Sequence, residues 1–410
     1  MELFIRPLDT QFYRSSLPFD AGVDSAAFSV FPPPPRALYG AIRAEGFCQK
    51  GISLSSSLTQ KDTVLGNKDE FGKLAIKGPL LVRLFRGEKR VGFVYLPFPF
   101  DLVKEKDTFI VRHLIPSEEI LGSFSDLQEP ELRALRADFS GNSEEVPVEQ
   151  VEGYFLTSGI CDYLCGEIGG EVLRNFAEPC FRLFQPEPRV GIKLSPGERT
   201  AQSGMLYQVW HYRLNSTDED WPLGFYVQVE GHGDDFSLSQ GILKLGGEGR
   251  PASYFQLESQ FNLWDTNKER VINKIIENGR FKALLVTPGI FQRGAIPDIC
   301  SSENGKLKGS LKGHHFYLVA AALGKSQEIG GWDIQNKRPK TLRKAVPAGT
   351  VYFFQFENWD TIEEKDRKEL ATKVWEEFNF KSFCSFDPWQ DGQEAGPGKE
   401  GFGIALIGGW

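Results

Sequence analysis

The sequence predicts an α+β protein made of two domains. Its 410 residues exceed what one hydrophobic core usually organises, so two cores are expected. Strand-like segments outnumber helical ones, and the helices are few and separated, which disfavours a doubly wound parallel sheet. The 43 glycines and 24 prolines are typical of a chain with many turns and irregular connections. We place the division at residue 180, which gives domains of 1–180 and 181–410.

The first half contains strand-like segments and one clear helix. The prolines at 32–35 cannot lie inside a helix, but the last can begin one, because the first helical position needs no amide hydrogen. A helix is therefore expected over 36–45, with Leu38 and Ile42 on one face and Gly46 as its end. Strands are expected at 3–6, 80–85 and 91–96, the last two joined in a hairpin.

The second half is predicted to be a further series of strands with two longer helices. The helix over 361–378 is the most regular, because Leu370, Val374 and Phe378 recur at helical spacing. A second helix is expected over 267–277. A shorter helix is expected from residue 158, and strands are expected at 190–194, 205–214, 225–230, 241–245, 281–287, 316–323, 351–356 and 402–407.

Charge is distributed unevenly along the chain. The net charge of −8 and the pI near 5.4 would by themselves argue against a nucleic-acid partner. Residues 101–152, however, hold 13 acidic and 5 basic side chains, which is the whole of that net charge. The remainder is neutral and can hold local basic patches, and phosphate binding depends on the field within about 8–10 Å. The acidic stretch has weak periodicity and is predicted to form surface helices and loops.

Several classes of protein are disfavoured by what the sequence lacks. None of its six cysteines forms a CxxC pair, and Cys161 and Cys165 have no matching pair downstream, so a zinc site is not expected. No apolar run approaches the roughly 20 residues that cross a bilayer, and the first residues lack a signal-peptide pattern. We expect a cytoplasmic chain with reduced thiols and with no metal, cofactor or membrane contact.

Two glycine clusters could bring the backbone close to a phosphate. The cluster at 244–250 follows a strand and has a cation at each end, although a plain strand-end turn remains the alternative. The cluster at 396–403 could lie flat against nucleic acid, but a flexible loop with Phe402 packed inward is the alternative. The candidate RNA-binding residues of these clusters are Lys244, Gly246, Gly247, Arg250, Gly401 and Gly403.

Two further segments carry positive charge. Residues 331–350 sum to +4, and their basic run at 337–344 leads into an expected strand that would hold it rigidly. Residues 189–200 mix strand formers with cations, so they form either a charged edge strand or one wall of a groove for a sugar-phosphate backbone. The candidate RNA-binding residues of these segments are Lys193, Arg199, Thr200, Lys340, Arg343 and Lys344.

Catalytic patterns are scarce. The sequence contains no HExxH, serine-elbow or CxxC motif. His314 and His315 are adjacent in an expected strand, so they would point to opposite faces and could not readily act together. If the chain were an enzyme, general acid–base catalysis would have to use His113, or the His314/His315 pair with Lys312.

Several of these motifs, taken in order along the chain, resemble the family of Cmr subunit three. That family comprises repeat-associated (RAMP) proteins of the type III-B CRISPR interference complex. The resemblance is specific because the motifs occur in the family's order from residue 9 to residue 409. The segments that carry it are 9–14, 18–19, 31–41, 189–192, 200, 204–207, 245–247, 250, 330–333, 343–353 and 400–408.

The resemblance implies two packed ferredoxin-like (RRM-like) βαββαβ domains with irregular insertions. It implies a non-catalytic subunit that binds the 5′ repeat-derived tag of the guide RNA (crRNA) in antiviral defence. The large polymerase-like subunit and the repeating backbone subunit would be its protein partners. Arg14 and Arg36 lie in the matched motifs and join the candidate RNA-binding residues. The acidic stretch 101–152 lies outside the matches and would face solvent or a protein.

Two alternatives remain open on the sequence. The first is a metal-independent endoribonuclease of the RAMP superfamily that processes CRISPR RNA with the histidines named above. The second is a protein-only scaffold whose basic patch is incidental.

Overall fold

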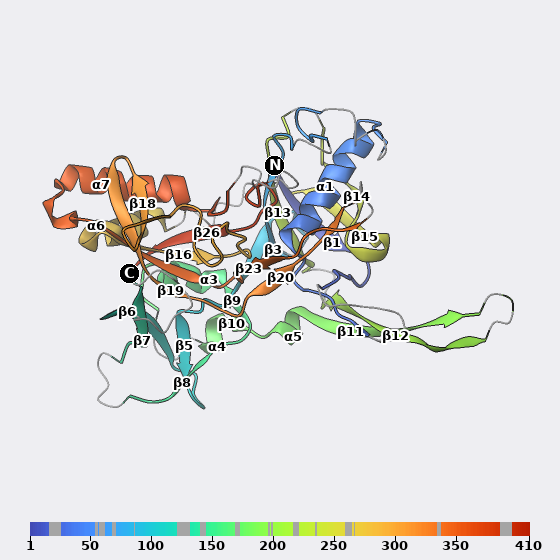
Figure 1. Cartoon of the computed structure of the whole chain (residues 1–410), viewed down its shortest axis with the longest axis horizontal. Coiled ribbons are helices and arrows are strands. Elements are labelled where there is room, and N and C mark those ends of the chain that lie inside the picture. Colours follow the sequence, from blue (N-terminus) through green and yellow to red (C-terminus); the bar gives the residue numbers. More distant parts are fainter. Residues whose placement is uncertain are drawn as a thin grey trace.

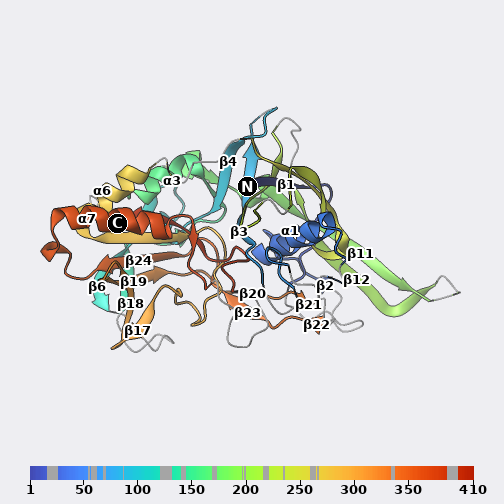
Figure 2. The same cartoon turned by 90° about the horizontal axis from the view of Figure 1, so that it is seen from above.

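A computed structural model describes most of the chain, and two large antiparallel sheets dominate it (Figure 1, Figure 2). The described residues are 1–15, 26–53, 56, 62–67, 71–85, 87–120, 132–139, 145–168, 173–195, 197, 200–215, 221–233, 236–258, 265, 267–333, 338–385 and 396–410. The mixture of many strands with a few separate helices confirms the α+β prediction.

The first sheet has eight described strands in the order β10-β9-β4-β3-β13-β1-β15-β14. Its centre is buried because β1 and β3 are rich in large apolar side chains, which makes these strands hydrophobic on both faces. Its strands are β1 (Glu2–Pro7), β3 (Ala75–Leu84), β4 (Val91–Pro97), β9 (Tyr154–Leu156), β10 (Ala177–Glu178), β13 (Leu223–Glu230), β14 (Gln240–Lys244) and β15 (Pro251–Gln256).

The second sheet has seven described strands in the order β17-β18-β19-β24-β16-β26-β25. β24 covers the residues predicted for that strand, and β26 overlaps the strand predicted at 402–407. Its strands are β16 (Arg280–Leu285), β17 (Ser301–Glu303), β18 (Lys306–Leu311), β19 (His314–Ala322), β24 (Val351–Phe356), β25 (Lys381–Ser382) and β26 (Ile404–Gly409).

Six α-helices are described, and the longer ones lie where periodicity predicts them. Val271 and Ile275 of α6, and Leu370 and Val374 of α7, are buried at helical spacing. In Figure 2 these two helices lie together on one face of the second sheet. The helices are α1 (Pro35–Gln49), α3 (Thr157–Leu164), α4 (Leu173–Phe176), α5 (Cys180–Leu183), α6 (Lys268–Asn278) and α7 (Glu364–Phe378).

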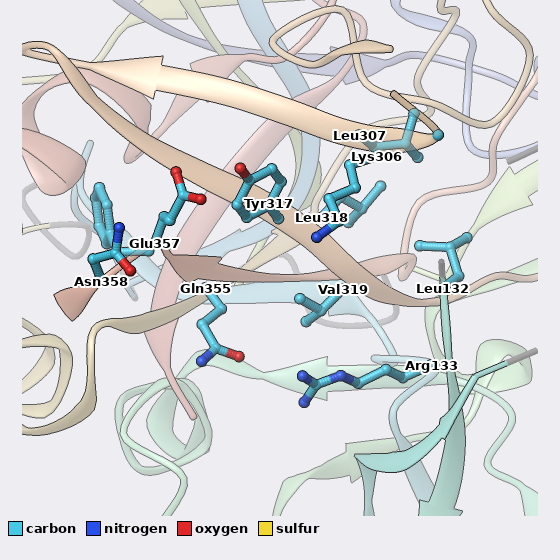
Figure 3. Close-up of a pocket in the computed structure, with 12 residues that line it drawn as sticks. Leu132, Arg133, Lys306, Leu307, Tyr317, Leu318, Val319, Gln355, Glu357 and Asn358 are labelled. Carbon is cyan, nitrogen blue, oxygen red and sulfur yellow. The ribbon is translucent and has the colours of Figure 1, made fainter. Parts of the chain in front are cut away.

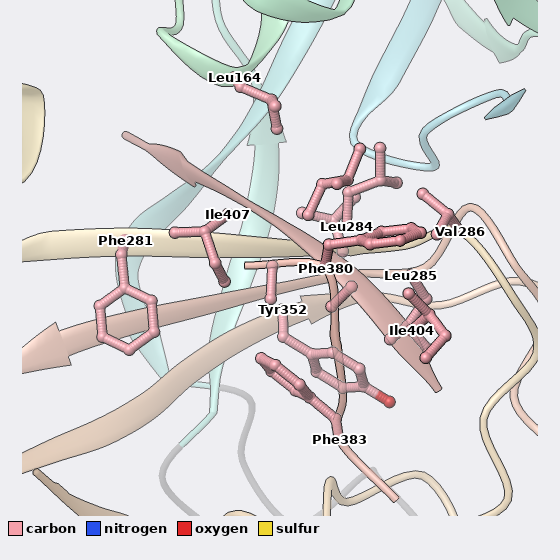
Figure 4. Packing of buried hydrophobic residues seen from close by; sticks show 14 of the residues in the cluster. Leu164, Phe281, Leu284, Leu285, Val286, Tyr352, Phe380, Phe383, Ile404 and Ile407 are labelled. Carbon is pink, nitrogen blue, oxygen red and sulfur yellow. The ribbon is translucent and has the colours of Figure 1, made fainter. Parts of the chain in front are cut away.

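One hydrophobic core joins the two large sheets. Phe4 and Val82 of the first sheet belong to the same buried cluster as Phe281 and Phe354 of the second. Figure 4 shows aliphatic side chains of β16 and β26 interlocked with aromatic rings at this level. A second cluster lies where α1 covers the first sheet, with Leu38 among its members. The two sheets are therefore held as one packed unit.

The expected division at residue 180 does not coincide with the boundary between the sheets. β13, β14 and β15 follow residue 180, yet they pair into the first sheet, where β13 and β15 flank β1. The second sheet begins only at β16. No composition change marks this boundary, because strands of both sheets have similar apolar patterns.

Among the described residues, four small sheets extend from this body. The three-stranded one includes a long arm, in which β11 and β12 pair as a hairpin that projects away from the molecule (Figure 1). A four-stranded sheet occupies the acidic stretch, and two short strand pairs lie between β19 and β24 in the chain. These strands are β2 (Ala26–Ala27), β5 (Leu102–Glu105), β6 (Val111–Ile120), β7 (Arg133–Ala137), β8 (Val148–Gln150), β11 (Phe184–Leu194), β12 (Ala201–Leu214), β20 (Gln327–Ile329), β21 (Trp332–Asp333), β22 (Arg338–Pro339) and β23 (Arg343–Ala345).

Two expectations about local structure are wrong. The acidic stretch 101–152 contains strands rather than helices where it is described, because β5, β6, β7 and β8 find partners in one another. Helix α1 continues past Gly46 to Gln49. Gly46 is needed for packing instead of for a helix end, since a Cβ there would lie 2.9 Å from Cδ2 of Leu65.

Candidate functional site

The glycine turn after β14 packs against Phe12 and Tyr13. The amide of Gly247 donates to the carbonyl of Phe12 at 2.7 Å. Gly246 has a φ of 77°, and a Cβ there would lie 2.8 Å from the same carbonyl oxygen. Glycine is therefore required for a close approach, but the approaching group is the protein's own backbone. Lys244 and Gly246 remain exposed at this turn.

Arg250, at the end of that turn, belongs to a network of ion pairs at the root of the arm. Its Nη1 lies 2.7 Å from Oδ2 of Asp9, and its Nη2 lies 2.8 Å from Oε2 of Glu248. Arg213 of β12 joins the same carboxylate, with its Nη2 at 3.1 Å from Oδ1 of Asp9, and its Nε lies 2.7 Å from Oε2 of Glu187. Within this network Arg250 is mostly buried and its charge is balanced, so it positions the arm and the turn.

No sequence pattern predicted the acidic partners in this network. Asp9 and Arg250 are far apart in the chain and no spacing rule links them. Asp9 is held ionised, because a backbone hydrogen bond from Thr10 and the charges of the nearby arginines lower its pKa below the ordinary 3.8. The pKa of Glu187 is likewise lowered, first by the hydrogen bond from Arg213.

We expect Asp9→Asn to loosen the root of the arm at pH 7 but not in acid. A carboxylate whose pKa is lower in the folded state adds stability above its unfolded pKa, and this stability is lost as the pH falls through the folded pKa. The protection of the Tyr212 amide, which donates to the carbonyl of Gln11 at 2.9 Å, should therefore differ between wild type and variant near neutral pH. The two proteins should converge below the lowered pKa of Asp9. Hydrogen exchange measures this difference.

The exposed pair of Glu303 with Lys308 provides the control for that experiment. Glu303→Gln removes a carboxylate whose pKa is also lowered, in β17 of the other large sheet, and should leave protection of Tyr212 unchanged. Equal protection in wild type and Asp9→Asn across the whole pH range would contradict the role of Asp9.

Arg36 and the second glycine cluster occupy the interior. Nε of Arg36 lies 2.9 Å from Oε2 of the buried Glu400, an ion pair that joins α1 to the segment before β26. Gly401 and Gly403 are buried, and a Cβ on Gly401 would lie 2.6 Å from the carbonyl oxygen of Gly78. The expectation that this cluster lies flat against RNA is therefore wrong, because the first sheet already covers it. Phe402 packs inward, fully buried.

The basic segment lies next to Arg36. The guanidinium Nη1 donates to the carbonyl of Gly330 at 3.4 Å, and the amide of Lys340 donates to the carbonyl of Gly331 at 3.0 Å. β23 pairs with β20 and brings Lys344 to the surface, with Arg343 partly covered. The structure thus joins the N-terminal end of α1 to this cationic strand pair, which sequence spacing did not predict. Lys337 of the run lies outside the described residues.

The remaining candidates lie on the arm and beside the glycine turn. Lys193 and Thr200 are exposed toward the tip of the hairpin, where the apolar side chains of Val190, Ile192 and Leu206 are exposed too. Arg199 and the quoted residues 18–19 lie outside the described residues. Arg14 is exposed, and its backbone forms an isolated β-bridge with Ser29. The ring of the preceding Tyr13 lies near Gly246. Residues 29–36 therefore connect the glycine turn to Arg36 and the basic segment.

A separate groove of about 350 Å³ lies on the second sheet (Figure 3). The side chains of Gln355 and Arg133 point toward each other across it, and Tyr317 lies near Glu357. The charged residues of its lining are Arg133, Lys306 and Glu357, and the rest includes several aliphatic side chains. This lining does not resemble a catalytic pair of nucleophile and general base.

The possible catalytic groups do not converge. Nε2 of His113 lies 2.7 Å from the carbonyl oxygen of Ile168, and burial lowers the pKa of this histidine. Lys312 pairs with Glu369. His314 and His315 are adjacent in β19 and so project to opposite faces. Within the described ranges, no group of three or more His, Cys, Asp or Glu side chains could hold a metal ion.

Comparisons with known proteins identify the family. A sequence model of the family described as CRISPR-associated protein (Cas_Cmr3) matches residues 3–410. No curated protein matches the chain. No helix in the described part of the chain is long and apolar enough to span a membrane.

Solved structures give more distant matches. One is a chain in the cryo-EM structure of the type III-B Cmr-beta bound to cognate target RNA, with 15% identity, a TM-score of 0.47, and coverage of 92% of this chain and 94% of that chain. Another is a chain in the crystal structure of the Csm3-Csm4 subcomplex of the type III-A CRISPR-Cas interference complex, with 10% identity, a TM-score of 0.38, and coverage of 86% and 92%. Because the family match spans almost the whole chain, the protein belongs to the CRISPR-associated protein (Cas_Cmr3) family.

Proposed function

We propose that the protein is the non-catalytic subunit that holds the 5′ repeat-derived tag of crRNA in a type III-B effector complex. The large polymerase-like subunit and the backbone RAMP subunit are its protein neighbours in this proposal. Membership of the CRISPR-associated family supports a role in a CRISPR effector complex. The endoribonuclease alternative would use His113 or Lys312 as an acid–base group, but His113 contacts the carbonyl of Ile168 and Lys312 pairs with Glu369, so we favour the binding role.

The observation that carries the proposal is the cationic surface around residues 29–36. At one end lie the exposed Lys244, next to the glycine turn, and the exposed Arg14, and at the other lie Lys340 and Lys344 of the basic segment. The chain between these ends is tied to both by hydrogen bonds. Single-stranded RNA is held by such combinations of cations and close backbone, which fix the position of its phosphates.

We further propose that each large sheet is a ferredoxin-like unit. In the first, β1 and β3 are antiparallel to the intervening β13, so they are parallel to each other and α1 connects them as a split βαβ unit. In the second, β19 and β24 are adjacent, and α7 leads from β24 to β26 across β16. Each unit then has one of its two helices replaced by irregular structure, and the boundary between the units falls between β15 and β16.

The experiment that tests RNA binding is charge reversal of the basic segment. Lys340→Glu with Lys344→Glu should weaken binding of tagged guide RNA to the reconstituted complex by about tenfold or more at physiological salt. Loss of two phosphate contacts should also reduce the slope of log affinity against log salt by about 1.4, since each contact to a single strand contributes about 0.7.

The control reverses two exposed cations of helix α7, which lies on one face of the second sheet (Figure 2). Lys365→Glu with Lys368→Glu on α7 makes the same change in net charge and should leave both the affinity and the slope unchanged. Equal effects of the two double variants would show that only overall charge matters, and no effect of the first would leave the scaffold alternative standing.

A further inference from the structure

Trp332 is a large apolar side chain held out in solvent. It lies in β21 opposite Pro339 of β22, and 56% of its surface is exposed. Among the tryptophans in the described ranges, it alone belongs to the exposed large hydrophobic residues. A single exposed apolar side chain needs no explanation, so its surroundings decide what it does.

The backbone that carries Trp332 is fixed from two sides. Arg36, itself anchored by Glu400, donates to the carbonyl of Gly330 at 3.4 Å, and the amide of Lys340 donates to the carbonyl of Gly331 at 3.0 Å. Ile329, which precedes these two glycines in the chain, is buried in the core. The backbone that carries the indole is therefore held in place. Little conformational entropy remains to be lost when a ligand stacks on the ring.

Cationic side chains lie next to the backbone that carries Trp332. A Cβ built on Gly331 would lie 3.2 Å from Cδ of Lys340 and 3.3 Å from Cδ of Arg36. Lys344 is exposed two residues after the exposed Leu342. In a chain with a net charge of −8, this exposed indole thus lies in a segment of local positive charge.

We propose that Trp332 is the stacking platform for one unpaired base of the RNA, with Lys340 and Lys344 holding the flanking phosphates. This inference rests on the proposed function and names the group that receives a base. Single-stranded nucleic acids are bound by aromatic faces set among cations, because every base has a π-face and each step of the strand carries a phosphate. A protein partner fits less well, since lysine is depleted in protein–protein interfaces.

The test compares Trp332→Ala and Trp332→Phe in the reconstituted complex. Trp332→Ala should weaken binding of the guide RNA about tenfold, as expected for loss of one stacked base. The slope of log affinity against log salt should not change, because stacking releases no counterions. Trp332→Phe should stay within about threefold of wild type, since phenylalanine also offers a π-face. With 2-aminopurine placed at successive positions of the 5′ tag, one position should lose its quenching only in the alanine variant.

Each failure has a distinct signature. If Lys340→Glu with Lys344→Glu weakens RNA binding but Trp332→Ala does not, the stacking role is wrong and the proposed function stands. If neither variant affects RNA binding, the proposed function itself fails. If Trp332→Ala instead reduces copurification of protein subunits in the absence of RNA, Trp332 is a protein contact and the inference is overturned.

Discussion

Asp101→Ala should lower the free energy of unfolding by about 3–5 kcal/mol, the usual cost of removing one partner from a buried ion pair. Oδ2 of Asp101 lies 3.4 Å from Nζ of Lys282, and these side chains are 1% and 2% exposed. The hydroxyl of Tyr163 donates to Oδ1 of the same carboxylate at 2.6 Å, and Nζ of Lys282 lies 3.7 Å from the centre of that ring. The cluster joins the segment before β5, helix α3 and strand β16.

The physical reason is the desolvation of Lys282. Burial already lowers its pKa, and Asp101 acts in the opposite direction. Without the carboxylate, the ammonium group must either stay charged without a partner or give up its proton. Chemical denaturation of Asp101→Ala and of a double variant, Asp101→Leu with Lys282→Met, measures the effect. The double variant should recover most of the loss, because it leaves no buried charge.

A loss below about 1 kcal/mol in Asp101→Ala, or an equal loss in the double variant, would contradict this account. The first result would mean that water reaches Lys282 when its partner is removed. The second would mean that the packing volume of the pair, rather than its charge, stabilises the contact between the segment before β5 and the second sheet.

Gly403→Ala is the second substitution with a large expected effect, about 2–4 kcal/mol from strain and overpacking together. Gly403 has a φ of 68°, in a region that side-chain-bearing residues rarely adopt. A Cβ there would lie 2.5 Å from Sγ of Cys384 and 3.2 Å from its backbone nitrogen. Both groups are buried, so the clash cannot be relieved toward solvent. The thermal midpoint of the variant measures the loss.

Gly294 provides a matched control for conformational strain. Its φ is 67°, and a Cβ there would have nothing within 4 Å. Gly294→Ala should therefore cost only about 1 kcal/mol, the price of a positive φ alone. If the two alanine variants lost the same stability, overpacking against Cys384 would contribute nothing.

Much of the secondary structure could be predicted from local sequence, because apolar periodicity is a local property. β24 and α7 were predicted almost to their ends, since their buried side chains repeat at strand and helix spacing. The acidic stretch was mispredicted because its strands, such as β7, are half-exposed and carry charges on both faces. Only pairing with neighbouring strands stabilises them, and that pairing cannot be read from periodicity.

The sequence predicted which segments carry positive charge, but not which of their residues are exposed to solvent. The basic segment at Lys340 and Lys344 does reach the surface. Gly401 was predicted to contact RNA but is buried. A glycine needed for contact with another strand looks the same in sequence as one needed for contact with a ligand. Arg250 looked available for phosphate, but its counter-ion Asp9 lies far away in the chain and only the fold brings them together.

The arrangement of the first sheet has a consequence for biosynthesis. β1 pairs on one side with β13, where Leu3 faces Val227, and on the other with β15, where Leu3 faces Gln256. At translation rates of 5–20 residues per second, β1 waits roughly 10–50 s on the ribosome before either neighbour has been made. During that interval both of its edges and its apolar side chains lack native partners, so the nascent chain should depend on chaperones until residue 256 has emerged.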